Sequence, residues 1–279
     1  MSLRIRIIAL LLTLLVVGSI GIGARCLSAT SARCTPSTLF GGGPALDVPY
    51  AETRTEAVEK MLDMARVGPG DRVVDLGTGD GRMLLQAAAR GAGGLGVDID
   101  PVLVADANAS AAAQGVADRV AFRTQDLFET PIADADVVTM FLLPEINLKL
   151  RPRLLSELRP GARVVSHAFT MGDWKPDLAE RVGGARLYLW VIPADVSGVW
   201  QLRDAGGERA LTLDQTFQTF SGEMGQGGAV FDGRVDGERV SFTLREGGWS
   251  VRYEGRVEGA TIVGNVPREW GAARLNSTL

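Results

Sequence analysis

Short apolar runs and helix-forming stretches alternate along the middle of the chain. Val73, Val74 and Leu76 make an apolar run too brief for a helix, which predicts a buried strand, and strong helix formers at 83–90 predict a helix after it. The same pattern predicts strands at 94–98, 121–127, 136–143, 162–169 and 185–192, and helices at 101–113 and 148–158. Strands that alternate with helices predict an α/β fold with a doubly wound sheet, for which 199–202 is the candidate seventh strand.

Beyond about residue 206 the pattern changes to alternation of apolar and polar residues, as at 211–218. The segment 231–237 is repeated in similar form at 253–259, and each copy contains two acid-glycine pairs. Such pairs between apolar strands predict hairpin turns. We therefore expect a small antiparallel β meander or partial barrel at 204–279.

The amino-terminal segment 7–24 carries no charged side chain and is preceded by Arg4 and Arg6. As a helix it would span about 27 Å, just under the hydrocarbon core of a bilayer, and it is somewhat long for the apolar part of a signal peptide. This favours an uncleaved signal anchor over a cleaved signal peptide. The expected organisation is a transmembrane segment at 1–24, a linker at 25–49, the doubly wound domain at 50–203 and the antiparallel β domain at 204–279.

Composition narrows the classes of function. The formal net charge is −4 and the sequence pI is about 5.2, so an extended nucleic-acid-binding face is not expected. The two cysteines, Cys26 and Cys34, lie outside any predicted core and indicate neither a metal site nor a disulfide framework.

The candidate chemistry begins at the end of the first predicted strand. Asp75 is followed at alternate positions by Gly77, Gly79 and Gly81, and then by the predicted helix. Glycines let a ligand approach the backbone, and the N–H groups at the start of a helix point outward, so the turn predicts a nucleotide-type site. The dinucleotide fingerprint G-x-G-x-x-G spaces its third glycine differently. A carboxylate at Asp75 repels phosphate but suits a ligand that carries an ammonium and a sulfonium.

This Asp-x-Gly-x-Gly-x-Gly segment resembles motif I of the class I, seven-strand S-adenosylmethionine-dependent methyltransferases. The resemblance implies a Rossmann-like seven-stranded sheet, S-adenosyl-L-methionine as cofactor, and a methionine portion held by the motif I acid and glycines. Asp98 ends the second strand about 20 residues after the first glycine, a spacing at which a carboxylate accepts hydrogen bonds from ribose hydroxyls. By the same resemblance, Asp126 accepts from the adenine amino group.

The acceptor side departs from the common pattern. Amino-group methyltransferases often carry an Asn/Asp-Pro-Pro-Tyr/Phe motif after the fourth strand, where this chain has Leu142-Leu143-Pro144-Glu145. We expect Leu143, Pro144 and Glu145 to line the acceptor side together with His167. His167 is the single histidine and lies near the carboxyl end of the fifth strand, where it is either a general base or a structural residue.

The order of several motifs resembles a narrower group: bacterial, often membrane-anchored relatives of the mitochondrial lysine methyltransferases that modify an ATP-synthase subunit. These motifs are Asp-Val-Pro-Tyr at 47–50, the glycine loop, Gly-Val-Asp-Ile-Asp at 96–100, Phe-Leu-Leu-Pro-Glu-Ile-Asn at 141–147 and Ser-His-x-Phe at 166–169. The resemblance implies direct methyl transfer to an acceptor that is either a protein lysine amine or a small molecule.

Two other functions account for parts of the sequence. An NAD-binding Rossmann oxidoreductase is disfavoured by the third-glycine spacing and by Asp75, and a non-catalytic membrane-tethered scaffold by the intact binding acids. The arginines on the two sides of 7–24 balance, so the positive-inside rule does not orient the segment. Because S-adenosylmethionine is made in the cytosol, we expect the catalytic domain on the cytoplasmic face of the membrane.

Overall fold

The structure, a computed structural model, describes residues 51–225, 227–264 and 270–275. The expected transmembrane segment at 1–24, the linker at 25–49 and both cysteines lie outside these residues. Within the described ranges, no helix is both long enough and apolar enough to cross a membrane.

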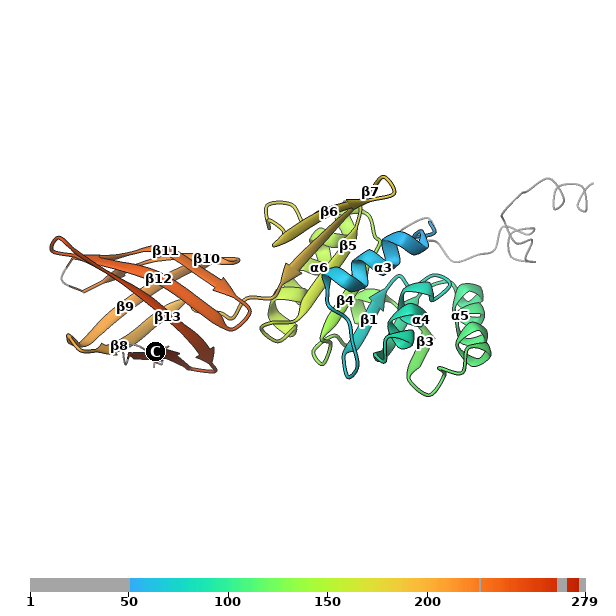
Figure 1. Ribbon diagram of the computed structural model, residues 1–279, viewed down its shortest axis with the longest axis horizontal. Coiled ribbons are helices and arrows are strands. Elements are labelled where there is room, and N and C mark those ends of the chain that lie inside the picture. Colours follow the sequence, from blue (N-terminus) through green and yellow to red (C-terminus); the bar gives the residue numbers. More distant parts are fainter. Residues whose placement is uncertain (1–50, 226, 265–269, 276–279) are drawn as a thin grey trace, which may run out of the picture. The chain divides into compact units, whose positions relative to one another are not determined.

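The first half of the described chain forms one seven-stranded sheet in the order β3-β2-β1-β4-β5-β7-β6 (Figure 1). Strand β7 pairs antiparallel with β5 and β6, whereas the other neighbours are parallel. The strands are β1 Arg72–Leu76, β2 Gly93–Asp98, β3 Val120–Thr124, β4 Val137–Met140, β5 Arg163–His167, β6 Leu178–Val182 and β7 Ala185–Val191. Chain order reverses between β1 and β4, and sheets of this kind bind ligands at the carboxyl ends of the strands beside such a reversal.

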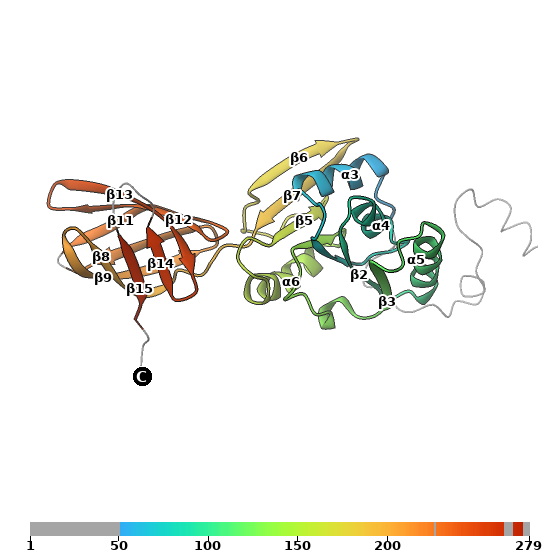
Figure 2. The same cartoon turned by 60° about the horizontal axis from the view of Figure 1, so that its bottom comes forward.

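Helices cover both faces of this sheet, as expected for a doubly wound fold. Three of them share one apolar layer with the sheet, and the fourth packs on the opposite layer (Figure 2). The first three are α3 Thr55–Met64, α4 Arg82–Ala89 and α5 Pro101–Ala113, and the fourth is α6 Pro144–Glu157. Helix α5 begins where the sequence predicts, because Pro101 occupies its first turn and the Asp100 side chain accepts a hydrogen bond from the Val102 N–H.

The carboxyl-terminal half forms a closed antiparallel barrel, so the antiparallel fold is as expected and the expected meander or partial barrel is corrected to a closed one. Consecutive strands pair with each other, and β15 pairs with β8 to close the ring. The strands are β8 Gly198–Asp204, β9 Gly207–Thr216, β10 Thr219–Met224, β11 Gly228–Asp236, β12 Arg239–Glu246, β13 Trp249–Glu258, β14 Thr261–Gly264 and β15 Gly271–Arg274. Buried aromatic side chains, among them Trp200, Phe242, Tyr253 and Trp270, fill its core.

Two strand predictions were wrong in ways that the packing explains. The segment 199–202 belongs to β8 of the barrel, and the remaining strand of the sheet is β6. Its side chains are mostly exposed, and its sequence, Leu-Ala-Glu-Arg-Val, does not alternate apolar and polar residues. Two acid-glycine pairs also lie inside strands rather than at turns. A Cβ at Gly233 would come within 2.2 Å of the Phe220 carbonyl, and one at Gly255 within 2.8 Å of the Trp270 ring. These glycines therefore make room for the barrel core.

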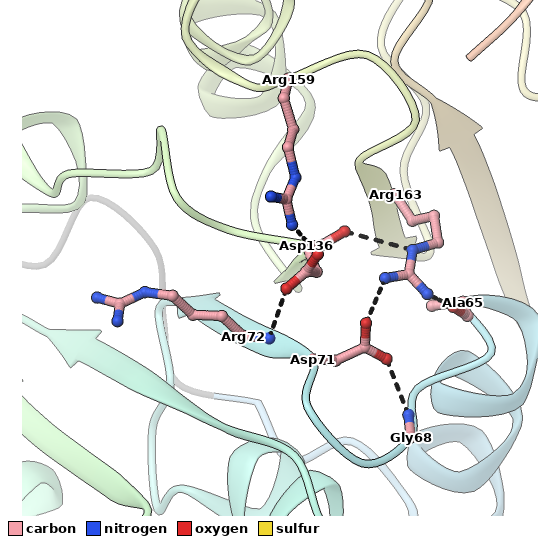
Figure 3. A network of polar contacts seen from close by, with 7 residues as sticks. All are labelled: Ala65, Gly68, Asp71, Arg72, Asp136, Arg159 and Arg163. Atoms are coloured by element: carbon pink, nitrogen blue, oxygen red, sulfur yellow. Dashed lines mark hydrogen bonds and ion pairs between the residues drawn. The ribbon is translucent and has the colours of Figure 1, made fainter. Parts of the chain in front are cut away.

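A polar network ties together the amino-terminal ends of three central strands, at the end of the sheet opposite the candidate site (Figure 3). Arg163, which begins β5, donates to the Ala65 carbonyl at 2.7 Å and to the Asp71 carboxylate at 2.6 Å. Asp136, just before β4, accepts from the Arg72 N–H at 2.8 Å, and its carbonyl accepts from Arg163. Charge-assisted contacts thus fix the starts of β1, β4 and β5 relative to each other and to the end of α3.

Near the carboxyl ends of the strands, the carboxylate of Asp75 is buried between β1 and β4. It accepts hydrogen bonds at 2.7 Å from the Thr78 and Thr139 hydroxyls, and the residue is 5% exposed. Burial raises the pKa of Asp75 to about 6, although the two hydroxyls counteract the rise. The folded state therefore binds the proton more tightly than the unfolded chain does. This contribution to the free energy of unfolding is lost as the pH rises from the ordinary pKa of 3.8 through about 6.

This burial makes the ligand-free fold sensitive to the charge at Asp75. Asp75→Asn removes the buried charge with little change in shape, so it should raise the free energy of unfolding at pH 8 by up to roughly 3 kcal/mol. Near pH 4, where the acid is protonated in the folded state, the gain should largely disappear. Urea denaturation of the wild type and the variant at the two pH values measures this. An equal loss of stability at both would contradict it.

Candidate active site

The candidate site is a cleft at the carboxyl ends of the parallel strands, next to the point where β1 and β4 lie side by side. Its walls come from the segment before α3, the glycine loop after β1, the ends of β2 and β3, and the exit of β4. Asp75, Gly77, Gly79, Asp98 and Asp126 all line it. The structure thus brings together all three acids that sequence reasoning placed around the cofactor.

The glycine loop adopts a backbone that side chains would disrupt. Gly77, Gly79 and Gly81 have φ angles of 79°, 55° and 81°, in the left-handed region that favours glycine. A Cβ at Gly77 would come within 2.9 Å of Leu142, and one at Gly81 within 2.7 Å of Phe122. Gly81 is the N-cap of α4 and does not itself line the cleft. Because it has no Cβ, α4 can begin close to Phe122 of β3.

Asp98 connects the end of β2 to this loop. One of its carboxylate oxygens accepts from the Gly79 N–H at 2.8 Å, and the other accepts from the Asp100 N–H at 3.0 Å. These hydrogen bonds hold the carboxylate at the mouth of the cleft with its orientation fixed. A carboxylate accepts several hydrogen bonds at once, so this one can also receive hydroxyl groups of a ligand.

Asp126 occupies the exit of β3, at the start of the short 3-10 helix Leu127–Glu129. Its side chain accepts from the Phe128 N–H at 2.8 Å, which fixes the carboxylate beside the cleft. Ile99 and Leu127 also line the cleft, and each directly follows one of the binding acids. This pair was not predicted from the sequence, although an apolar residue after each strand-end acid was a usable signal for the walls of a planar base site.

Charge in the cleft is predominantly negative. Six carboxylate side chains and one guanidinium, that of Arg82, line it. The carboxylates are those of Glu52, Asp75, Asp80, Asp98, Asp100 and Asp126. Arg82 donates to Asp80 and forms an ion pair with Glu52 at 3.2 Å. Because the lining is acidic and apolar, it favours a cationic, base-bearing ligand and disfavours a pyrophosphate.

The residues expected on the acceptor side lie in different places. Leu143 is the N-cap of α6, Pro144 is in its first turn, and Glu145 is exposed in that turn; none of the three lines the cleft. Helix α6 begins earlier than predicted because Pro144 suits a first helical turn. Phe141, which sequence reasoning quoted within a motif but did not select, lines the cleft instead.

His167 ends β5 and lies beside Phe141, with 3.9 Å between the ring centroids. Its Nδ1 is 3.3 Å from the Thr53 hydroxyl, and the residue is 8% exposed. Burial lowers the pKa of His167, so the imidazole is neutral near pH 7. It lines a pocket that adjoins the cleft rather than the cleft itself.

S-adenosylmethionine fits this set of residues. Its ammonium and sulfonium suit the acidic end of the cleft at the glycine loop, and its ribose hydroxyls suit the Asp98 carboxylate. Its adenine suits the apolar walls formed by Ile99 and Leu127, beside which Asp126 lies. The features that would exclude it, a basic lining or a side chain filling the loop, are absent from the part of the cleft that the structure describes.

Comparison with known proteins agrees with this geometry. The family described as the ANTKMT methyltransferase domain matches residues 75–178. The chain is 40% identical over 151 residues to a protein-lysine N-methyltransferase from Saccharolobus islandicus, with 52% of this chain and 94% of that protein covered. It is 35% identical to the adenine nucleotide translocase lysine N-methyltransferase of Mus musculus, with 53% of this chain and 64% of that protein covered.

A solved structure is similar over the same share of the chain. It is that of an RNA methyltransferase from Salinibacter ruber in complex with S-adenosyl-L-homocysteine, with 48% sequence identity, a TM-score of 0.51, and coverage of 52% of this chain and 96% of that chain. The glycine loop, the binding acids, the strand order and these relatives agree. The chain therefore belongs to the class I S-adenosylmethionine-dependent methyltransferases, the family of the archaeal protein-lysine N-methyltransferase.

Proposed function

We propose that this methyltransferase acts on the side-chain amine of a protein lysine. The observation that carries the proposal is the 40% identity to a protein-lysine N-methyltransferase of which 94% is covered. The mammalian lysine methyltransferases among the relatives support the same class of acceptor, although the chain spans only 64% and 55% of two of them. An acidic lining at the cleft also suits a cationic acceptor residue.

In this proposal the protein contributes mainly by binding and orientation. When bound, the cofactor supplies an electrophilic methyl group: the lysine nitrogen lone pair forms the N–C bond while the C–S bond breaks and leaves its electron pair on sulfur. Asp98 would orient the ribose, and the glycine loop with Asp75 would hold the methionine portion. Alignment of nucleophile and methyl can supply several kcal/mol of the barrier reduction.

Before transfer the lysine ammonium must lose a proton. His167 is the group that we propose to receive it, because its imidazole is neutral near pH 7 and lies beside Phe141 at the edge of the cleft. The start of α6, which comes shortly after Phe141, would then shape the acceptor side without lining the cleft. Its residues there are Leu143, Pro144 and Glu145.

RNA is the second candidate acceptor, because the similar solved structure is that of an RNA methyltransferase. The net charge of −4 and the acidic cleft disfavour a polyanion. Protein lysine therefore remains the proposed acceptor.

We also propose that residues 7–24 anchor the enzyme in a membrane with the catalytic domain on the cytoplasmic face. The uncharged length of the segment supports an anchor, and the cytosolic origin of the cofactor supports the orientation. A cleaved signal peptide with export is the alternative.

The role of Asp98 can be tested directly. Asp98→Asn keeps an oxygen for one loop N–H but removes the charge that binds hydroxyls, so the affinity for S-adenosylhomocysteine should fall tenfold to a hundredfold. Equilibrium dialysis measures the affinity, and circular dichroism checks the fold. The exposed Asp118→Asn serves as the matched control and should bind like the wild type. Unchanged binding by Asp98→Asn would remove the ribose assignment.

The acceptor class can be tested with labelled donor. The full chain is incubated with methyl-labelled S-adenosylmethionine and with soluble and membrane extracts of its host, and samples are then treated with protease or ribonuclease. We expect protease-sensitive label, located on lysine by mass spectrometry. Label released by ribonuclease would replace lysine with RNA as the acceptor.

The placement in the membrane has its own test. A reporter that is active only in an oxidising compartment, fused to the carboxyl terminus, should stay silent while the protein remains in the membrane fraction. A clear reporter signal would contradict the cytoplasmic placement.

A further inference from the structure

A second pocket adjoins the candidate cleft at the carboxyl ends of the strands. It has a volume of about 250 Å³, and Ala51, Glu52 and Phe141 line both the pocket and the cleft. A side chain that enters the pocket from solvent would therefore reach the cleft beside Phe141.

The walls of the pocket suit an unbranched aliphatic stem. Ala57 of α3 forms one side, and Val182 and Ala185, which flank the turn of the β6–β7 hairpin, form the other. The hairpin turn itself is Gly183-Gly184, whose φ angles of 55° and 86° need glycine. These small and β-branched side chains make this part of the pocket lining apolar.

The inner end of the pocket suits an amine. Phe141 and His167 lie there with 3.9 Å between their ring centroids. An aromatic ring face attracts a cationic nitrogen, and a neutral imidazole neither repels it nor prevents loss of its proton. The Thr53 hydroxyl, 3.3 Å from Nδ1, fixes the orientation of the His167 ring.

The rim of the pocket carries two carboxylates and one guanidinium, from Glu52, Glu56 and Arg54. Glu52 is already paired with Arg82 at 3.2 Å. For Glu56, in contrast, the described residues show no ion pair, and its carboxylate lies against the hairpin, where a Cβ on Gly183 would be 3.2 Å from Oε2. The exposed Glu56 carboxylate thus lies beside the hairpin where it lines the pocket, and it can receive a positive charge from a partner.

We infer that the acceptor lysine enters between the first turn of α3 and the β6–β7 hairpin, and that Glu56 at the entrance selects a basic residue next to that lysine. The inference rests on the proposed methyl transfer to lysine and adds the route and the sequence context of the acceptor. Its substrate is an extended peptide segment in which lysine has an arginine or lysine neighbour.

The route is tested by filling the pocket. The probe is a fluorescent synthetic peptide with one lysine between two arginines, and its binding to the full-length protein saturated with S-adenosylhomocysteine is followed by anisotropy. Ala185→Leu should weaken peptide binding at least tenfold and leave S-adenosylhomocysteine binding within twofold. Arg186→Leu adds the same side chain one residue further, outside the pocket, and should bind the peptide like the wild type.

The role of Glu56 is tested by charge. The wild type should prefer the arginine-flanked peptide to a glutamate-flanked one by at least fivefold, and Glu56→Gln should reduce that preference to twofold or less. Glu59→Gln, on the same helix but outside the pocket, is the matched control and should keep the preference.

Two results would overturn the inference while the proposed function stands. They are wild-type-like peptide binding by Ala185→Leu, and equal binding of the two peptides by the wild type, each in a protein that binds S-adenosylhomocysteine and labels lysine in extracts. A wild type that binds S-adenosylhomocysteine but labels no lysine would instead remove the proposed function.

Discussion

The hydrogen bond from the Gly79 N–H to the Asp98 carboxylate is the contact on which the site depends. It ties the loop after β1 to the end of β2, which are neighbouring parallel strands in register from Arg72 and Gly93 onward. The loop can adopt its conformation because its three glycines accept positive φ angles and leave no Cβ to collide with Leu142 or Phe122. Backbone shape and carboxylate position are therefore set together.

This arrangement determines which ligand the cleft favours. In a dinucleotide site the loop and helix N-terminus face a pyrophosphate, whereas here buried and half-buried carboxylates surround the loop. Asp75 is ionised near pH 7 in spite of its burial, with a pKa raised to about 6, and a ligand cation beside it would stabilise that charge. The free-energy cost of the buried charge in the ligand-free protein is thus partly recovered on binding a cation.

Much of the sheet domain could be predicted because its signals are local. The run of apolar residues at β1, the glycine turn and Pro101 at the start of α5 each specify their element within a few residues. Strand β6 could not be predicted, because it lies at the edge of the sheet and most of its side chains are exposed. Closure of the barrel depends on pairing between β15 and β8, which are far apart in sequence, and no local pattern reports such pairing.

The candidate site shows the same division. Asp75, Asp98 and Asp126 lie within two residues of the ends of β1, β2 and β3, so their spacing sufficed to bring them to one cleft. Phe141 and His167 come from adjacent strand ends too, but their partners in the second pocket come from α3 and from the hairpin that contains the unpredicted β6. The proposed acceptor side therefore required the tertiary structure, whereas the proposed cofactor side did not.

The central claim is that a carboxylate-lined glycine loop selects a cationic sulfur nucleoside over a phosphate-bearing one. Titration calorimetry of the full chain with S-adenosylmethionine and with NAD, at pH 8, tests it most directly. We expect saturable binding of S-adenosylmethionine and at least a hundredfold weaker binding of NAD. Binding of NAD with equal or higher affinity would contradict the account.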